Sequence, residues 1–209
     1  ASLIIHYLKA QKEKKYISNA FQLYMAPELV NELLRNPDKL KYGGSQQEIS
    51  VLFSDIRSFT AYTEKHQPEE TVQILKEYLT AMVDIIKANC GIVDKFVGDE
   101  IMALFGTPVA YPDHALQACR TALQMREALT TLQAKWKTEG KDDFDIGIGI
   151  NTGFAVVGNL GSEQIFDYTA IGDTVNMGAR LENLNKEILT GSKIIISEAA
   201  YIKVKDCVE

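Results

Sequence analysis

The order of strand-like and helix-like segments is the feature that most constrains the fold of this chain. Alternating apolar residues predict strands, and apolar residues repeated every three or four positions predict helices. Between residues 48 and 151 these patterns occur as a strand, a helix, two strands, a helix and a strand, over residues 48–54, 68–89, 93–105, 113–137 and 144–151. This β-α-β-β-α-β order predicts a ferredoxin-like α+β core, in which two helices cover an antiparallel sheet.

Each predicted helix has an apolar face that is expected to pack against the sheet. In the first helix this face consists of Val72, Leu75, Leu79, Met82 and Ile86. Gly91 is expected just past the end of that helix, where glycine is favoured. The core is followed by C-terminal extensions, which we predict as a strand, a hairpin, a helix and a strand at residues 155–158, 166–170, 174–185 and 193–196.

Turn residues near position 45 divide the chain into two predicted parts. Residues 2–35 have a helical apolar period, so residues 1–45 are predicted as an N-terminal helical linker or stalk, and residues 46–209 hold the folded domain. The N-terminal helix is expected either to lie on the domain or to act as a stalk that pairs in a dimer. No complete membrane span and no signal peptide are visible, and the chain starts with Ala. We therefore expect a fragment of a longer protein.

Composition excludes some classes of function. The net charge of −6 argues against a general nucleic-acid binder, which would need a basic surface. The three cysteines show no CxxC spacing, so we expect reduced thiols in a cytoplasmic domain. That domain is expected to be either free or part of a membrane-anchored protein.

Two aspartates stand at the ends of strands that this topology makes neighbours. Asp55 ends the first strand, and Asp99 lies at the tip of the central hairpin. Either residue alone is more often a solvated turn residue. Two adjacent carboxylates repel each other and therefore call for a cation. Mg²⁺ accepts one or two carboxylates together with phosphate oxygens, so the pair predicts a metal–nucleotide site.

Two further segments offer groups for a phosphate or a sugar. The loop from Ile56 to Thr60 leads from a strand into a helix, and its backbone N–H groups could bind phosphates, although by itself it is equally an ordinary strand-to-helix loop. Asn176 and Arg180 are four residues apart on a predicted helix and therefore share a face. An Arg there suits phosphate, and the Asn suits a ribose oxygen. On spacing alone, surface roles are the better interpretation for both.

Four segments together resemble the catalytic domain of the class III nucleotidyl cyclases. They are SDIRSFT, DKFVGDEIMALFG, GIGINTG and YTAIGDTVNMGARLE, in the family's order and at its spacing, within residues 46–204. The resemblance implies the β-α-β-β-α-β core predicted above. It also implies a homodimer whose active sites each use residues of both protomers, and two Mg²⁺ or Mn²⁺ ions per site.

The resemblance assigns roles to individual residues. Asp55 and Asp99 fall on the two metal-binding aspartates, with the carbonyl of Ile56 as a further metal ligand. Phe59 and Thr60 fall in the loop that holds the β- and γ-phosphates. The remaining matches are Lys95 and Thr169 at the base-selecting positions, Asn176 as the ribose-orienting asparagine, and Arg180 as the arginine that stabilises charge on the α-phosphate.

The nature of the base follows from hydrogen-bonding chemistry at those two positions. Adenine presents an acceptor at N1 and donors at its 6-amino group, which suit a Lys donor and a Thr acceptor. Guanine would want a carboxylate where Lys95 stands, although a Lys can also reach guanine O6. We therefore predict an adenylyl cyclase that converts ATP to 3′,5′-cyclic AMP and pyrophosphate. A guanylyl or dual-specificity cyclase and a non-catalytic dimerisation module remain as alternatives.

The chain departs from the family pattern at the residues that bind the triphosphate. Some family members carry an Arg where this chain has Gly147. The family's triphosphate-binding Lys lies in a final hairpin that residues 46–209 are expected to lack. The N-terminal segment resembles the linker that joins such cyclases to a sensor or membrane domain, so an upstream domain is an expected partner.

Overall fold

The computed structural model describes residues 12, 43–162, 164–188, 191 and 193–207. The predicted N-terminal helix lies almost entirely outside these residues, so its role and the boundary at residue 45 stay predictions. Residues Gly43–Glu209 form one compact unit. In the described part of the chain, no helix is both long enough and apolar enough to span a membrane.

The described unit alternates strands and helices in the predicted order, with two additions. The core elements are β1 (Gly43–Ile56), α3 (Phe59–Lys65), α4 (Pro68–Ala88), β2 (Ile92–Val97), β3 (Glu100–Phe105), α5 (His114–Thr138) and β4 (Ile146–Gly161). The extensions are β5 (Phe166–Ile171), α6 (Asp173–Leu184), β6 (Ile194–Ile196) and α7 (Glu198–Val204). The short helices α3 and α7 were not predicted, because each has only 7 residues and therefore little periodicity to detect.

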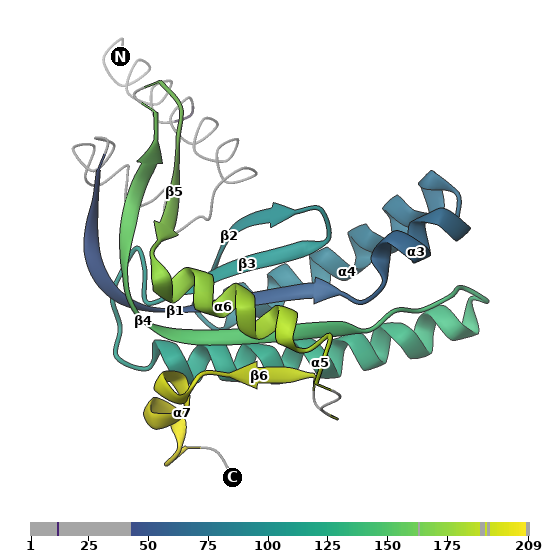
Figure 1. Ribbon diagram of the computed structural model, residues 1–209. Coiled ribbons are helices and arrows are strands. Elements are labelled where there is room, and N and C mark those ends of the chain that lie inside the picture. Colours follow the sequence, from purple (N-terminus) through teal and green to yellow (C-terminus); the bar gives the residue numbers. More distant parts are fainter. Residues whose placement is uncertain (1–11, 13–42, 163, 189–190, 192, 208–209) are drawn as a thin grey trace, which may run out of the picture. The chain divides into compact units, whose positions relative to one another are not determined.

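The sheet has the ferredoxin-like strand order and confirms the predicted α+β fold. Its order is β2-β3-β1-β4-β5, and each neighbouring pair is antiparallel. β6 pairs in parallel with Ile148–Ile150 of β4. These residues lie in the first half of β4, whereas β5 pairs with the second half. β4 and β5 extend as a long hairpin away from the helical layer (Figure 1). The predicted strands at 144–151 and 155–158 are thus parts of one 16-residue strand.

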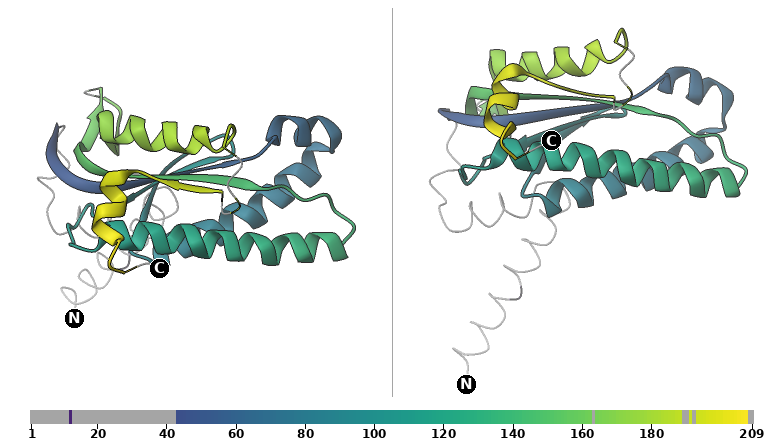
Figure 2. Two further views of the ribbon diagram at one scale, coloured as in Figure 1. Left: turned by 60° about the horizontal axis from the view of Figure 1, so that its bottom comes forward. Right: turned by 90° about the horizontal axis from the view of Figure 1, so that it is seen from below.

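Helices cover both faces of the sheet. α4 and α5 lie on one face, and α6 lies on the other (Figure 2). The approach of α6 to the sheet is close because two glycines meet there. A Cβ on Gly149 would lie 2.2 Å from the backbone N of Glu182, and one on Gly178 would lie 2.6 Å from a methyl group of Val51. Glycine is therefore required on both elements for α6 to pack at this distance.

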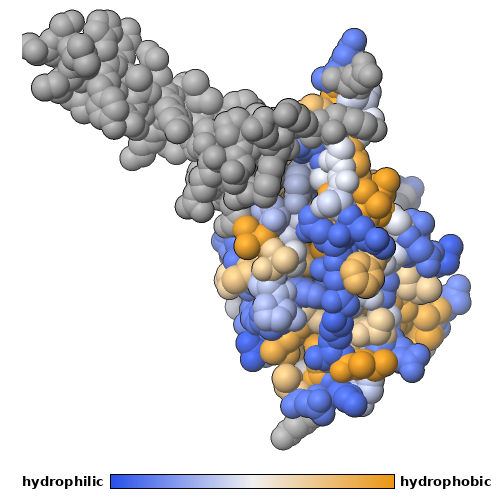
Figure 3. Space-filling model, turned by 90° about the vertical axis from the view of Figure 1, so that its left-hand side faces the viewer, coloured by the Kyte–Doolittle hydropathy of each residue, from blue (hydrophilic) through white to orange (hydrophobic). Residues whose placement is uncertain are grey.

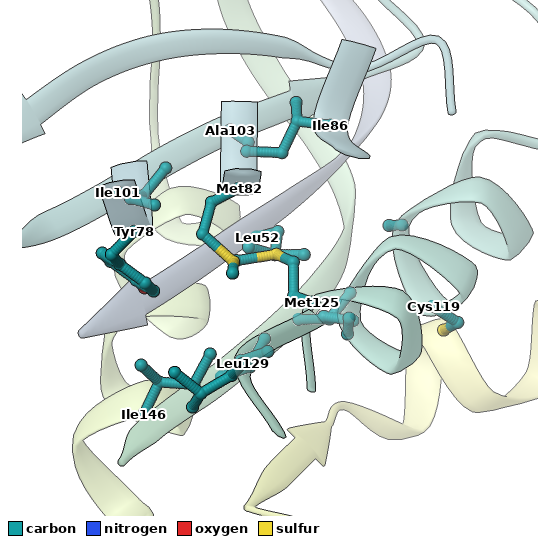
Figure 4. Close-up of a cluster of buried hydrophobic side chains, with 14 of the residues drawn as sticks. Leu52, Tyr78, Met82, Ile86, Ile101, Ala103, Cys119, Met125, Leu129 and Ile146 are labelled. Atoms are coloured by element: carbon teal, nitrogen blue, oxygen red, sulfur yellow. The ribbon is translucent and has the colours of Figure 1, made fainter. Parts of the chain in front are cut away.

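The main core lies between the sheet and the pair α4 and α5. Figure 4 shows Leu52, Tyr78, Met82 and Met125 converging in it. The predicted face of α4 is only partly right. Met82 and Ile86 are buried and Leu75 and Leu79 are partly buried, but Val72 is 64% exposed. The buried stripe is Thr71, Ile74, Tyr78, Met82 and Ile86.

The end of α4 is also built differently from the prediction. Cys90, with φ 59°, adopts the left-handed conformation that was expected of Gly91. Gly91 is needed for packing instead, because a Cβ there would lie 2.5 Å from the Phe105 ring. The same sequence signal, a glycine after a helix, has a different physical cause here.

Candidate active site

The structure brings Asp55 and Asp99 together at one end of the sheet. In the β1–β3 register Ser54 pairs with Ile101, so the next residue of β1 lies beside the hairpin tip that carries Asp99. Gly98 has φ 65° in that tip, a conformation that glycine adopts without strain. The backbone N–H of Ile56 donates to Asp99 Oδ2 at 3.2 Å. The three residues predicted to hold metal are therefore neighbours.

The carboxylates at this end disfavour their own ionisation. Burial, and then the nearby charge of Asp55, raise the pKa of Asp99 to about 6. Burial and the charges of Asp55 and Glu182 likewise raise the pKa of Glu100. A divalent cation would relieve this repulsion, so the donor chemistry fits a hard metal ion. Among the described residues no group of three or more His, Cys, Asp or Glu side chains could hold a metal. Mg²⁺ commonly takes phosphate oxygens and water beside one or two carboxylates.

Two basic side chains that the sequence analysis did not single out surround Asp55. Lys186 Nζ lies 3.3 Å from Asp55 Oδ2, and Arg57 Nη1 lies 3.7 Å from the same oxygen. Arg57 also pairs with Glu182, whose side chain is fully buried. We call this set, Asp55, Asp99, Glu100, Glu182, Arg57 and Lys186, the metal cluster. Lys186 stands four residues after Glu182 and just past the end of α6, where no motif marks it, so sequence reasoning had little signal for it.

Gly147 contributes to the metal cluster by having no side chain. It pairs with Asp55 across β1 and β4. A Cβ on Gly147 would lie 1.5 Å from Arg57 Nη2. The Arg57 guanidinium thus fills the space above Gly147. An arginine side chain therefore occupies the place where some family members carry an Arg, but it comes from the residue that follows β1.

The predicted phosphate loop leads directly into α3. Ser58 has φ 57° and precedes Phe59, the first residue of the helix. Phe59 is partly buried and stacks on Tyr62 with ring centroids 6.3 Å apart, while Thr60 is exposed. The loop therefore adjoins Asp55 and Ile56 in sequence. Its role in binding phosphate stays a prediction.

The two base-selecting residues are joined by a third residue, Asp94. Thr169 Oγ1 donates to Asp94 Oδ2 at 2.7 Å, and Lys95 Nζ lies 3.9 Å from the same oxygen. The Asp94 side chain is fully buried, whereas that of Lys95 is 40% exposed. We call these three residues the base cluster. Sequence reasoning named Lys95 and Thr169 but missed Asp94, although Asp94 stands directly before Lys95.

Asn176 and Arg180 do not join the metal cluster of their own chain. Both side chains are exposed on α6, whereas Glu182 and Lys186, further along the chain, contact Arg57 and Asp55. Within the described part of the chain neither Asn176 nor Arg180 has a side-chain hydrogen bond or ion pair. Within one chain, Asn176 and Arg180 thus have no contact with the two carboxylates.

Comparison with known proteins supports the same reading. The profile of the adenylate and guanylate cyclase catalytic domain matches residues 42–207. The chain is 37% identical over 192 residues to Adenylate cyclase 1 of Rhizobium meliloti (strain 1021). That match covers 90% of this chain and 28% of the relative, so the chain spans well under a third of the relative's length.

Solved structures of both substrate classes resemble this fold. The guanylyl cyclase Cya2 is 38% identical, with a TM-score of 0.74 over 80% of this chain and 83% of that chain. The adenylyl cyclase CyaB from P. aeruginosa is 34% identical, with a TM-score of 0.74 over 80% of this chain and 85% of that chain. With its fold, its paired aspartates and this profile match in agreement, the chain belongs to the family of adenylate and guanylate cyclase catalytic domains.

Proposed function

We propose that this domain is an adenylyl cyclase that converts ATP to 3′,5′-cyclic AMP and pyrophosphate. The observation that carries the proposal is the adjacency of Asp55 and Asp99 in a domain that also holds Lys95 beside Thr169. The first pair accounts for a metal–triphosphate site. The second accounts for a base site with one donor and one acceptor, which matches adenine.

In the proposed reaction the 3′-oxygen of ATP attacks its own α-phosphorus, and the bond to the pyrophosphate oxygen breaks. Asp55 and Asp99, with the Ile56 carbonyl, would hold two Mg²⁺ or Mn²⁺ ions. When bound, these ions acidify the 3′-hydroxyl and neutralise the triphosphate. Asn176 would orient the ribose, and Arg180 would stabilise the charge that develops on the α-phosphate. Phe59 and Thr60 would hold the β- and γ-phosphates through backbone N–H groups.

Arg57 and Lys186 have a role in the metal cluster before substrate arrives. Each lies within 4 Å of Asp55 and offsets part of its charge. Lys186 is half exposed and therefore able to move, whereas Arg57 is held by the buried Glu182. We infer that Lys186 would turn away from Asp55 once Asp55 served as a metal ligand, and that its ammonium would then bind a phosphate oxygen.

The separation of Arg180 from the metal cluster supports a homodimer. A second copy related by a two-fold axis would bring its own Lys95, Thr169, Asn176 and Arg180 to the carboxylates of the first. Large apolar side chains are exposed on β2, β4 and β5 and next to them, as expected of an interface; they are Phe96, Val97, Phe154, Val156, Ile165 and Ile171. On the side shown in Figure 3, hydrophobic surface occurs in patches between hydrophilic residues.

Mixing two inactive variants tests this arrangement. Asp55→Asn removes a metal ligand, and Arg180→Ala removes the transition-state arginine on the other protomer. An equal mixture that exchanges subunits freely contains half mixed dimers with one intact site each, so about a quarter of the wild-type activity should return. Mixing Asp55→Asn with Asp99→Asn should restore nothing. Equal recovery in both mixtures, or none in the first, would contradict the shared site.

The base preference is tested by separating cyclic products. The purified protein is incubated with Mn²⁺ and either ATP or GTP, and cyclic AMP and cyclic GMP are quantified. We expect cyclic AMP to dominate. Exclusive cyclic GMP formation would show that the domain is a guanylyl cyclase, the alternative that the similarity to the guanylyl cyclase Cya2 supports. No product with either nucleotide would favour a non-catalytic dimerisation module.

The setting of the domain is a further part of the proposal. We expect residues 1–42 to link it to an upstream sensor or membrane domain, within a protein whose cyclase domain faces the cytoplasm. Removal of residues 1–42, which leaves β1 intact, should then change the basal activity. Unchanged activity and unchanged dimerisation after this truncation would contradict a regulatory role.

A further inference from the structure

We propose that Asp94 is a positioning residue for nucleotide selection, because its carboxylate forces the Thr169 hydroxyl to act toward the base only as an acceptor. This inference rests on the proposed adenylyl cyclase function and names the group that sets its base preference. Asp94 itself is not expected to touch the nucleotide.

The hydrogen bond between Thr169 and Asp94 has a fixed direction. An ionised carboxylate has no proton to donate, so the hydroxyl of Thr169 must donate to Asp94 Oδ2 at 2.7 Å. A threonine hydroxyl has a single proton and two lone pairs. Once its proton is committed to Asp94, Oγ1 presents only lone pairs to a ligand. It can then accept from the 6-amino group of adenine but repels the O6 carbonyl of guanine.

A β-bulge in β2 brings the Asp94 side chain close to that of Lys95, the next residue in the sequence. Consecutive residues of a regular strand point to opposite faces of the sheet. In β2, however, Val93 pairs with Ala103 and Lys95 pairs with Met102, so Asp94 is the extra residue of a β-bulge. Bulges re-aim side chains. This one lets Asp94 and Lys95 serve the same cluster, with their charged atoms 3.9 Å apart.

A contribution to the stability of the fold does not account for a carboxylate at position 94. Its side chain is fully buried, and its second oxygen, Oδ1, has no hydrogen-bond partner among the described residues. Burying a carboxylate with one accepted hydrogen bond is unfavourable, and a neutral or apolar residue would cost less. Burial accordingly raises the pKa of Asp94 to about 6, while Thr169 and Lys95 oppose this shift. At pH 7.5 the carboxylate is still mostly ionised, as the orientation of Thr169 requires.

Lys95 and Thr169 then form a fixed donor–acceptor pair around one carboxylate. The Lys95 ammonium can only donate, and Thr169 can only accept. With Lys95 facing N1 and Thr169 facing the substituent at position 6, the pair is complementary to adenine, whereas guanine would present N1–H to the Lys95 donor and O6 to the Thr169 acceptor. Without Asp94 the Thr169 hydroxyl would be able to rotate and donate to guanine O6, which removes half of the discrimination.

The test compares ATP and GTP as substrates of Asp94→Asn. An asparagine has the same shape, but its amide can either accept from Thr169 or donate to it, so the hydroxyl direction is no longer set. We expect the ratio of kcat/KM for ATP to that for GTP to fall about tenfold, because discrimination of this size follows from one mispaired polar group. Since the neutral form is easier to bury, Asp94→Asn should fold at least as well as the wild type. Asp94→Ser provides a second variant without the carboxylate and should lower the ratio similarly.

Matched variants distinguish the orientation of the Thr169 hydroxyl from the effect of a nearby negative charge and from a general loss of activity. Asp167→Asn removes an exposed carboxylate whose charge acts on Asp94, and it should leave the ratio unchanged. Thr169→Ser keeps the hydroxyl and should keep the ratio. In a Thr169→Val background, Asp94→Asn should have no further effect on the ratio.

The outcomes distinguish the inference from the function on which it rests. A wild-type protein that prefers GTP would overturn both. A wild-type protein that prefers ATP, together with equal losses for both nucleotides in Asp94→Asn, would overturn only the positioning role. A ratio that falls in Asp94→Asn and stays constant in Asp167→Asn would support it.

Discussion

The metal cluster and the base cluster both contain a carboxyl group whose pKa is raised to about 6, but for different reasons. At Asp99 burial acts together with the repulsion of Asp55. At Asp94 burial acts against a hydrogen bond from Thr169 and the charge of Lys95. Among the described residues Asp99 forms no ion pair with a basic side chain, whereas Asp94 has a hydrogen-bond donor in Thr169 and a nearby cation in Lys95.

This difference indicates what each cluster is built to bind. Adjacent carboxylates that repel each other gain free energy when a cation enters, so the metal cluster is prepared for a charged ligand. The Asp94 carboxylate already accepts a hydrogen bond from the Thr169 hydroxyl and lies 3.9 Å from the Lys95 ammonium. It can only impose a direction on that hydroxyl, so the base cluster is prepared for a neutral ligand with ordered donors and acceptors. Several substitutions can test this contrast.

The largest expected effect is the loss of turnover in Asp55→Asn. Removal of one of two metal carboxylates should lower cyclase activity by more than about 100-fold, since the ions carry most of the charge stabilisation. Activity is measured as cyclic AMP formed with Mn²⁺, and binding as the shift of Tm on adding Mn²⁺. Asp84→Asn, an exposed aspartate on α4, is the matched control and should retain both. A full Mn²⁺ shift in Asp55→Asn would contradict the metal assignment.

A smaller effect, on stability, is expected at Gly147. Gly147→Ala places a methyl group where the Arg57 guanidinium lies and should force Arg57 away from the buried Glu182. A broken buried ion pair costs about 3 kcal/mol of the free energy of unfolding. Denaturant unfolding measures this cost.

The control for Gly147 is the same substitution in an Arg57→Ala background. There the pair is already broken, so the additional methyl group should cost much less. Equal costs in the two backgrounds would show that Arg57 does not occupy this space in solution.

The smallest expected effect is a change in the pH dependence of stability at Asp99. Its pKa is raised in the folded protein above the unfolded value near 4, so the folded state binds the extra proton. The stability that this proton contributes is fully present below about pH 4 and is lost as pH rises through about 6. In metal-free buffer, the Tm advantage of Asp99→Asn over the wild type should therefore grow between pH 5 and pH 7.5.

The comparison with Asp99→Asn removes contributions of other groups, such as His114, whose pKa burial lowers. Adding Mn²⁺ should stabilise the wild type more at pH 7.5 than at pH 5, because the ion competes with the proton. A constant Tm difference between the two proteins across this range would contradict the raised pKa of Asp99.

Much of the fold was predictable because it rests on local periodicity. The strands at 48–54 and 93–105 and the helices at 68–89 and 113–137 match β1, β2 with β3, α4 and α5 within a few residues. Their order leaves few ways to form a sheet, which is why the strand order followed. The inward face of α4 was less predictable, since Thr71 and Tyr78 occupy buried positions that an apolar count assigns elsewhere.

In the candidate site, too, the residues in local motifs were predictable and the residues that act through distant partners were not. Asp55, Asp99, Lys95, Thr169, Asn176 and Arg180 were recognisable because short motifs carry them. Lys186, Glu182 and Asp94 were not, because each acts through a partner far away in sequence: Lys186 and Glu182 meet Asp55 and Arg57, and Asp94 meets Thr169. Similarly, nothing in the motif GIGINTG indicates that Arg57 fills the space over Gly147.

The sequence by itself determined the ferredoxin-like core and the identity of the carboxylates at its strand ends, because hydrophobic period and short motifs are local properties. The tertiary structure alone decided which charges surround those carboxylates and which hydroxyl Asp94 orients. Burial, hydrogen-bond direction and ion pairing depend on residues that only the folded sheet brings together. For the same reason, only the structure could show that Asn176 and Arg180 are exposed on α6, the observation on which the proposed homodimer rests.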